Sequence, residues 1–160
     1  ASDVYKRQTS GGVGLLGCEM GGQAALRLAY RHPDKFPIAA AIAPAIDFHL
    51  GMRHGHDWAD GELFDTLWEI FDEPEQARQE TAILHVHPLN WPRHQWLVSS
   101  SNDARWHDGA VRLSSKLIAL GIPHTAILDE NTHEDIVSAF ADDAISFIMK
   151  SLDAEARRVS

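Results

Sequence analysis

The chain has 160 residues, of which 44% are apolar and 23% are charged, as in an ordinary globular domain with its own core. Acidic residues outnumber basic ones by 23 to 14, and this net charge of −9 disfavours nucleic acid as a partner because phosphate binding needs a basic surface. No apolar run approaches the ~20 residues of a membrane span. The single cysteine, Cys18, excludes an internal disulfide framework and is compatible with a reducing, cytoplasmic compartment without establishing one.

The first residues differ in character from the rest of the chain. Residues 1–8 resemble the in-frame translation of a transposase adapter used in sequencing libraries, so we expect them not to be native. The chain also has no initiator methionine. We therefore expect the native protein to begin upstream. On this expectation the chain is an inactive and marginally stable truncation that exposes the edge of a strand at 13–16.

Apolar patterning predicts strands that alternate with helices. The expected buried strands are 13–16, 38–43, 95–99 and 124–128. The expected helices, in which apolar residues recur with the 3.6-residue period, are 21–31, 62–71, 108–120 and 135–152. This alternation predicts a three-layer α/β fold with a mostly parallel sheet, in which functional residues lie at the carboxyl ends of the strands. The charged tail 153–160 is expected to fray.

The middle of the chain is predicted to be an insertion. Residues 49–60 form a polar, histidine-rich segment that we expect to be a loop. The helix at 62–71 follows, 74–80 could add a further helical turn, and 85–93 contains two prolines and is expected to be irregular. We predict that 49–94 lies over the carboxyl edge of the sheet, where a substrate lid would sit.

The segment Gly17-Cys18-Glu19-Met20-Gly21 follows an expected strand and precedes an expected helix. Two glycines four residues apart, in this position, are typical of the strand–turn–helix elbow of G-x-S-x-G hydrolases. In that elbow a strained turn exposes a serine nucleophile at its tip. Here the tip residue is Glu19. We expect Gly21 and Gly22 to let the helix pack close to the sheet.

Two further polar residues follow later strands. Asp103 comes after the strand at 95–99, and His133 comes after the strand at 124–128, just before the last helix. The order Glu19, Asp103, His133 is that of nucleophile, acid and histidine in the α/β-hydrolases.

Together these motifs resemble the C-terminal half of an α/β-hydrolase, in the putative-esterase group that includes esterase D (S-formylglutathione hydrolase) and the antigen 85-like esterases. Residues 17–22 resemble the G-x-S-M-G-G of that group, and 24–34 resemble the helix that follows it. The remaining similar segments are 40–45, 102–103, 116–124 and 132–133. The similarity extends over most of 9–152, which we interpret as the C-terminal part of one hydrolase domain.

The resemblance implies a hydrolase that acts on a small carboxylic ester or thioester. It assigns His133 as the base, Asp103 as its orienting acid and Glu19 to the nucleophile position, with the backbone N–H of Met20 as one oxyanion donor. The second donor comes from a loop before the elbow, which this chain does not include. Neither a cofactor nor a metal is implied, and the oligomeric state is left open.

The replacement of serine by Glu19 leaves several interpretations open. A carboxylate is a poor acyl nucleophile, because its attack on an ester gives an anhydride that readily reverses. Glu19 could therefore mark an inactive fold kept for binding. It could instead attack an alkyl carbon, as the aspartate-nucleophile dehalogenases and epoxide hydrolases of this superfamily do, or act as a general base for water. A sequencing error in a serine codon is the last alternative.

The other candidate residues have structural interpretations too. Cys18 lies one position before the tip, so the pleat should direct it to another face, and we expect a small buried residue. Asp103 could merely cap its loop. Asp108 is the alternative acid, although a role as helix N-cap explains it. His133 could be a solvated loop residue.

Two groups have the superficial look of metal sites, one formed by His54, His56 and Asp57 and the other by His85 and His87. Neither contains the full ligand set of a zinc site. We interpret these residues as solvated loop side chains, and the sequence predicts no metal site.

Overall fold

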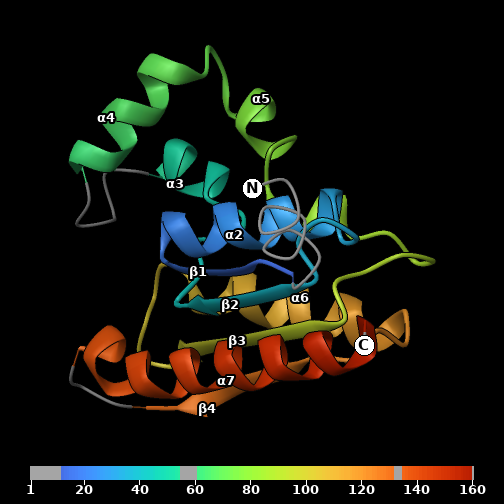
Figure 1. The fold of residues 1–160 in the computed structure, drawn as a ribbon. Helices are drawn as coiled ribbons and strands as arrows, with labels where there is room; N and C mark the ends of the chain where they lie inside the picture. The colour runs from blue at the N-terminus through green and yellow to red at the C-terminus, as the bar shows by residue number, and fades with distance from the viewer. Residues whose placement is uncertain (1–11, 55–60, 132–134, 160) are drawn as a thin grey trace, which may run out of the picture.

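The computed structural model describes residues 12–54, 61–131 and 135–159. Within them the chain forms one four-stranded parallel sheet in the order β1-β2-β3-β4 (Figure 1). The strands are β1 (Gly14–Cys18), β2 (Ile38–Ile42), β3 (His94–Ser100) and β4 (Thr125–Glu130). All four predicted strands are therefore present, with bounds shifted by one or two residues.

The central strand β2 explains how the sheet is covered on both faces. All five of its residues are buried, and its sequence is isoleucine, three alanines and isoleucine. Ala39 and Ala41 belong to the apolar cluster on one face, whereas Ala40 and Ile42 belong to the cluster on the other. Side chains alternate between faces along a strand, so an uninterrupted apolar run needs a helical layer on each side.

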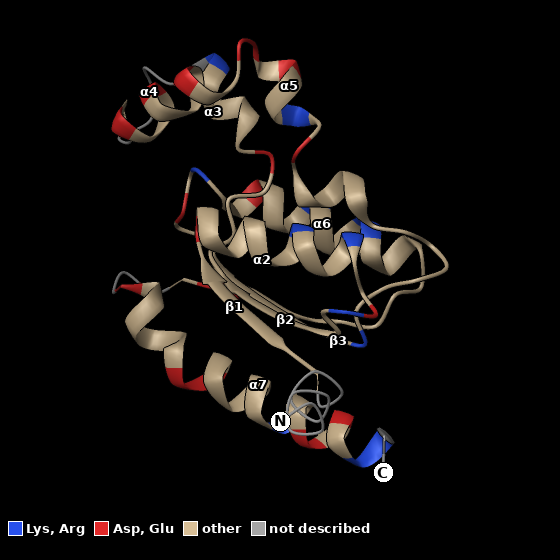
Figure 2. Cartoon of the chain, turned by 45° about the horizontal axis from the view of Figure 1, so that its top comes forward, with Lys and Arg blue, Asp and Glu red and all other residues tan. Residues whose placement is uncertain are grey.

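Three helices supply these layers. Helices α2 (Met20–Arg31) and α6 (His107–Ala119) contribute Leu26 and Leu113 to the core on one face. Helix α7 (Ile136–Val159) packs Ala144 against the other face, and Figure 2 shows it on the side of the sheet opposite α2 and α6. The predicted three-layer α/β fold is confirmed. No helix of the described residues combines the length and the apolar character that a membrane span requires.

The middle of the chain forms a separate group of short helices, seen in green at the top of Figure 1. They are α3 (His49–His54), α4 (Gly61–Ile70) and α5 (Pro74–Arg78). The 3₁₀ helix η2 (Ala82–His85) follows them and packs against α2, with Ala82 in the core of the sheet. The expectation of a loop from residue 49 is wrong for the part that forms α3. Phe48 and Met52 are buried beside Phe64 and Leu67 of α4 in a separate apolar cluster. This packing stabilises helix α3, which the polar sequence of the segment does not predict.

The start of α6 also differs from the prediction. The helix begins at His107, with Trp106 as its N-cap residue, so Asp108 is not the cap but lies in the first turn. The loop before the helix is held by Asp103, whose Oδ1 accepts the N–H of Arg105 and of Trp106 at 2.9 and 3.2 Å. Asp103 thus orders the loop before α6, and no side chain of the described residues caps the first turn of this helix.

The expectation that 153–160 frays is wrong for the described residues, because α7 continues to Val159. Glu155 is buried, with only 3% of its surface exposed. It accepts hydrogen bonds from Arg93 Nε and Nη2 at 2.8 and 2.6 Å, and its Oε1 lies 3.0 Å from His94 Nε2. These bonds attach the end of α7 to the start of β3, a tie that local charge patterning does not reveal.

The first strand lies at the edge of the sheet. Within the described residues β1 pairs only with β2. Val13 and Leu16 are 43% and 44% exposed, respectively. Such exposure of apolar side chains is unusual at a strand of a parallel sheet, whose faces are normally covered.

The Glu155 site predicts a dependence of stability on pH. The hydrogen bond from Arg93, and then that from His94, lower the pKa of Glu155 from 4.5 to about 2. Because the folded state favours the ionised form, this contribution is complete above about pH 4.5 and is lost as the pH falls toward 2. We expect Glu155→Gln to lower the free energy of unfolding at pH 7 by about 2 kcal/mol.

Urea denaturation at pH 7 and pH 3 measures this effect, and Asp153→Asn, at an exposed position of the same helix, is the control. The difference in free energy of unfolding between the native protein and Glu155→Gln should be smaller at pH 3 than at pH 7. The control variant should match the native protein at both pH values. A difference in unfolding free energy that is the same at pH 3 as at pH 7 would show that the ion pair does not cause it.

Candidate active site

A single residue, Glu19, connects β1 to α2, as the elbow prediction requires. Its φ of 51° and ψ of −117° lie in a strained region that costs on the order of 1–3 kcal/mol. Backbone hydrogen bonds hold this turn from two sides. The Glu19 N–H donates to the carbonyl of Ile42 at 3.0 Å, and the Glu19 carbonyl accepts the N–H of Gln23 and of Ala45 at 3.0 and 2.9 Å.

Two glycines make the tight turn possible. A Cβ on Gly17 would overlap the carbonyl group of Gly21 and approach the backbone nitrogen of Gly22 to 2.6 Å. A Cβ on Gly22 would lie 3.2 Å from Cβ of Ala41 in β2. A Cβ on Gly21 would meet open space. The close approach of helix and sheet therefore depends on Gly17 and Gly22, and the expected role of Gly21 in it is wrong.

Backbone strain is concentrated at this edge of the sheet. The non-glycine residues with positive φ in the described part of the chain are Glu19, Ala43 and Asp47, with φ of 51°, 49° and 58°. They follow the carboxyl ends of β1 and β2. Asp47 is held by an ion pair of its Oδ2 with Arg112 Nε at 2.8 Å and by a hydrogen bond from its N–H to Thr81 Oγ1 at 3.0 Å. Such clusters of strain are typical of functional sites.

Asp103, the predicted acid, lies at the same edge, in the loop between β3 and α6. Its side chain is 17% exposed. Because its Oδ1 accepts two backbone N–H groups, the capping role considered as the alternative is present in the structure. Its role as a triad acid stays a prediction.

Arg105 is a site residue that sequence reasoning did not single out. Its Nη2 lies 3.6 Å from Glu19 Oε1, and its Nε lies 3.8 Å from Asp103 Oδ1. One guanidinium thus lies between the elbow carboxylate and the carboxylate of the acid loop. The Glu19 side chain is 54% exposed, so this ion pair contributes about 0–1 kcal/mol and acts on position rather than stability. Only its place two residues after Asp103 could have drawn attention to it.

The loop after β4 is tied to the acid loop. The N–H of Ser101 donates to the carbonyl of Glu130 at 2.7 Å, and Nδ2 of Asn102 donates to the carbonyl of Asn131 at 2.6 Å. Asn102 directly precedes Asp103. The segment that leads from β4 toward α7 therefore starts beside the acid loop.

His133, the predicted base, lies outside the described residues. Its described neighbours on both sides belong to this region. Asn131 contacts the acid loop, and the carboxylate of Asp135 lies near enough to Cys18 to raise the pKa of its thiol. The described residues Asn131 and Asp135 thus lie near the carboxyl edge of the sheet.

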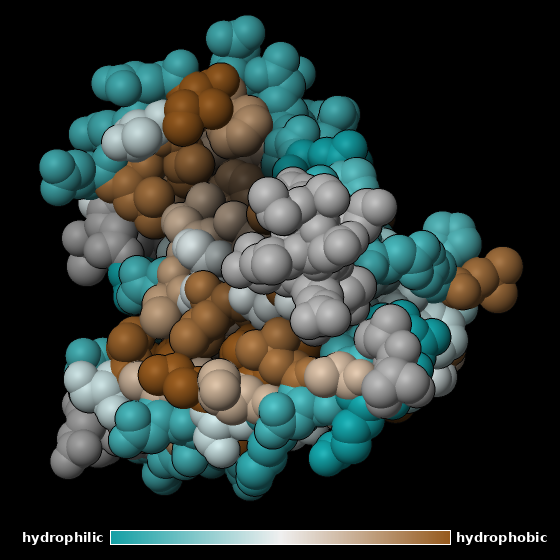
Figure 3. All heavy atoms as spheres, viewed as in Figure 1, coloured by the Kyte–Doolittle hydropathy of each residue, from teal (hydrophilic) through white to brown (hydrophobic). Residues whose placement is uncertain are grey.

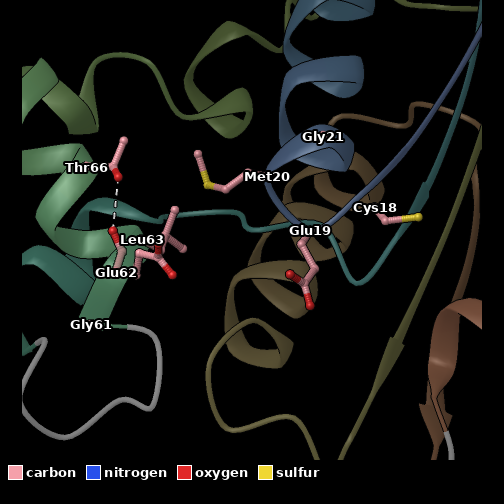
Figure 4. Close-up of a pocket in the computed structure, with 8 residues that line it drawn as sticks. All are labelled: Cys18, Glu19, Met20, Gly21, Gly61, Glu62, Leu63 and Thr66. Carbon is pink, nitrogen blue, oxygen red and sulfur yellow. Dashed lines mark hydrogen bonds between the residues drawn. The ribbon is translucent and has the colours of Figure 1, made fainter.

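Cys18 lies next to the elbow tip, but its environment does not activate it. Burial raises the pKa of its thiol, and the negative charges of Glu19 and Asp135 raise it further. A thiol with a raised pKa stays protonated at neutral pH and is a weak nucleophile. We expected a buried residue, whereas Cys18 is only partly buried and lines the pocket at the elbow. In Figure 4 its sulfur points away from the Glu19 carboxylate.

The pocket beside the elbow has a volume of about 600 Å³. The elbow residues Glu19 and Met20 line one side, and Glu62 and Thr66 of α4 line the other (Figure 4). In this view the Met20 side chain extends from the elbow toward α4, and the hydroxyl of Thr66 donates to the carbonyl of Glu62 at 3.0 Å. The pocket thus lies between the elbow and part of the insertion that we predicted as a lid.

The structure assembles no metal centre from the described residues, which contain no group of three or more His, Cys, Asp or Glu side chains able to hold an ion. His85 and His87 each have a ring nitrogen within hydrogen-bond distance of a backbone group. The other suspected group is formed by His54, whose side chain is not described, and by His56 and Asp57, which lie outside the described residues.

Solved structures with similar folds are α/β-hydrolases. A ferulic acid esterase superposes with a TM-score of 0.61 at 13% identity, covering 92% of this chain and 56% of that one. The dipeptidyl peptidase 4 of Porphyromonas gingivalis gives a TM-score of 0.59 at 16% identity, covering 88% of this chain and 20% of that one. This chain therefore spans just over half of the esterase and a fifth of the peptidase. These likenesses define the fold as that of the α/β-hydrolases.

The sequence itself matches the family described as "Putative esterase" over residues 3–135. Because the match covers most of the chain, the protein belongs to this family. The match begins within 1–8, whose origin in a sequencing adapter stays a prediction. No curated protein sequence matches the chain significantly.

The elbow glycines allow a matched test of the turn. Gly17→Ala should destabilise the protein by about 3 kcal/mol or more, because the new Cβ would overlap the backbone of Gly21. Gly21→Ala should be neutral or stabilising by up to about 1 kcal/mol, because its Cβ meets open space and alanine favours the helix. Urea denaturation of both variants measures the difference, and equal stabilities would contradict the close approach.

Proposed function

We propose that this protein is an esterase-like hydrolase that acts on a carboxylic ester or thioester, with Glu19 at the nucleophile position. The observation that carries the proposal is the strained elbow, which holds Glu19 at φ 51° beside a pocket of about 600 Å³. Membership of the esterase family supports this reaction class. The name of the ferulic acid esterase adds esters of aromatic acids to the substrates to be tested.

The chemistry of a carboxylate favours a role for Glu19 as a general base. In this scheme the Glu19 carboxylate takes a proton from water while the water oxygen forms a bond to the carbonyl carbon. The bond from that carbon to the leaving oxygen or sulfur then breaks, and the proton passes to the leaving group. This route avoids the reversible anhydride that direct attack by the carboxylate would form.

The first turn of α2 can stabilise the negative charge that develops on the carbonyl oxygen. Met20 is the first residue of that helix, so its N–H has no acceptor within the helix. Such an N–H, at the positive end of the helix dipole, is suited to an oxyanion. Met20 is therefore proposed as one oxyanion donor.

His133 is proposed as the triad base, which relays the proton to the leaving group, with Asp103 as its orienting acid. The support comes from the described residues around it. Asn131, two positions before His133, receives a hydrogen bond from the residue that precedes Asp103. This contact beside Asp103 supports the proposal for His133.

A non-catalytic binding protein is the second candidate, and Arg105 favours it. The guanidinium lies 3.6 Å from the Glu19 carboxylate and also beside Asp103. A cation in this position pairs with the carboxylate and competes with a substrate for it. A site that binds without reacting would keep this ion pair intact.

Ester hydrolysis by the full-length protein tests the two candidates. The protein as found is compared with Glu19→Gln, Glu19→Ser and His133→Ala, using p-nitrophenyl acetate and an acyl thioester. We expect turnover by the protein as found, and a loss of about hundredfold or more in Glu19→Gln and in His133→Ala.

Other outcomes are equally decisive. Turnover that appears only in Glu19→Ser would reject a catalytic carboxylate and favour the binding role. A covalent adduct on Glu19 after treatment with an alkyl halide or an epoxide, found by mass spectrometry, would show instead that Glu19 is a nucleophile that attacks an alkyl carbon. Absence of turnover in every form would reject the hydrolase.

A further inference from the structure

A second groove lies beside the elbow pocket, and Met20 lines both. This groove has a volume of about 440 Å³ and runs between α2 and α4. Ala24 and Leu28 of α2 line one wall, and Leu67 and Ile70 of α4 line the other. Figure 3, drawn in the view of Figure 1, shows hydrophobic residues gathered in this region of α4 and α2.

The walls of the groove are apolar although they face solvent. Leu28 is 39% exposed and Ile70 is 65% exposed. Arg27 of α2 and Glu80, which form an ion pair, also line the groove. From Met20 to Arg27 the helix rises by about 10 Å. The lining residues of α2 therefore extend along the helix for about two turns from the elbow residue Met20.

We propose that this groove receives an elongated apolar group of the ester, so that the site prefers substrates carrying a medium-length alkyl or arylalkyl chain. The proposal rests on the proposed function, because it places the ester carbonyl at the elbow. A chain attached to that carbonyl would pass Met20 and lie along α2, covering Leu28 and Ile70. Glu19 and Glu62 line the elbow pocket, and their charges favour a neutral ligand over a carboxylate.

Binding of two ketones to the full-length protein tests the groove without any need for turnover. Methyl octyl ketone keeps the carbonyl group and the chain but cannot be hydrolysed, and acetone lacks the chain. Each fully buried methylene strengthens binding by about three- to fourfold. Since the groove is open, we expect methyl octyl ketone to bind at least about thirtyfold more tightly than acetone.

Carbon-13 labelling of the methionine methyl groups locates the ligand. The Met20 signal, assigned by its loss in Met20→Leu, should shift with methyl octyl ketone and saturate. Met149, which is 56% exposed on α7, is the control for non-specific contact, and the buried Met52 reports that the fold is intact. Equal shifts of Met20 and Met149, or no shift of Met20, would overturn the proposal.

A matched pair of variants tests the location independently. Ala24 is exposed in the groove, and Ala139 is exposed on α7, away from it. Ala24→Phe should weaken binding of methyl octyl ketone by tenfold or more, and Ala139→Phe should leave it unchanged. Ile70→Asp, which places a charge in the groove, should weaken it as well and serves if Ala24→Phe does not fold. Unchanged affinity in the folded groove variants would refute the assignment.

The outcomes separate this inference from the proposed function. Chain-dependent binding at Met20 without hydrolysis of any ester would keep the groove and reject the reaction. Ester hydrolysis together with equal affinity for the two ketones would support the proposed reaction and reject the groove as the binding site of the chain.

Discussion

The close approach of the end of β1 to the first turn of α2 is the constraint on which the site depends. Gly17 lies against the backbone of Gly21 and Gly22, with no room for a side chain at position 17. The chain can reverse there only through a left-handed residue, and Glu19 takes that conformation. This turn also orders its surroundings, because Ile42 at the end of β2 and Ala45 beyond it bond to the backbone of Glu19. A strained residue thus stands at the tip of a rigid elbow.

What that elbow presents is a carboxylate beside a cation. Glu19, Arg105 and Asp103 come from two loops that follow β1 and β3, and the parallel sheet brings these loops to one edge. A serine at the tip would have no charge for Arg105 to pair with. The arginine is therefore consistent with a site in which glutamate is accommodated. This charge arrangement distinguishes the site from the G-x-S-x-G elbow on which its backbone is patterned.

The sequence predicted most of the fold because the signals were local. The uniformly apolar run of β2, the helical period of α6 and the glycine spacing of the elbow each depend on residues that are adjacent in the chain. The errors arose where distant residues decide. Helix α3 is supported by packing against α4, and the end of α7 is held by a bond of Glu155 to Arg93, 62 positions away.

The sequence by itself determined the four strands and the helices α2, α4, α6 and α7 in their order, the family and the elbow with Glu19 at its tip, because periodicity and motif spacing are properties of the chain. Only the tertiary structure decided that Arg105 lies between Glu19 and Asp103, that burial and two nearby carboxylates raise the pKa of the Cys18 thiol and that an apolar groove runs from Met20 along α2. These features depend on which loops and helices meet in space, and neither residue spacing nor composition contains that information.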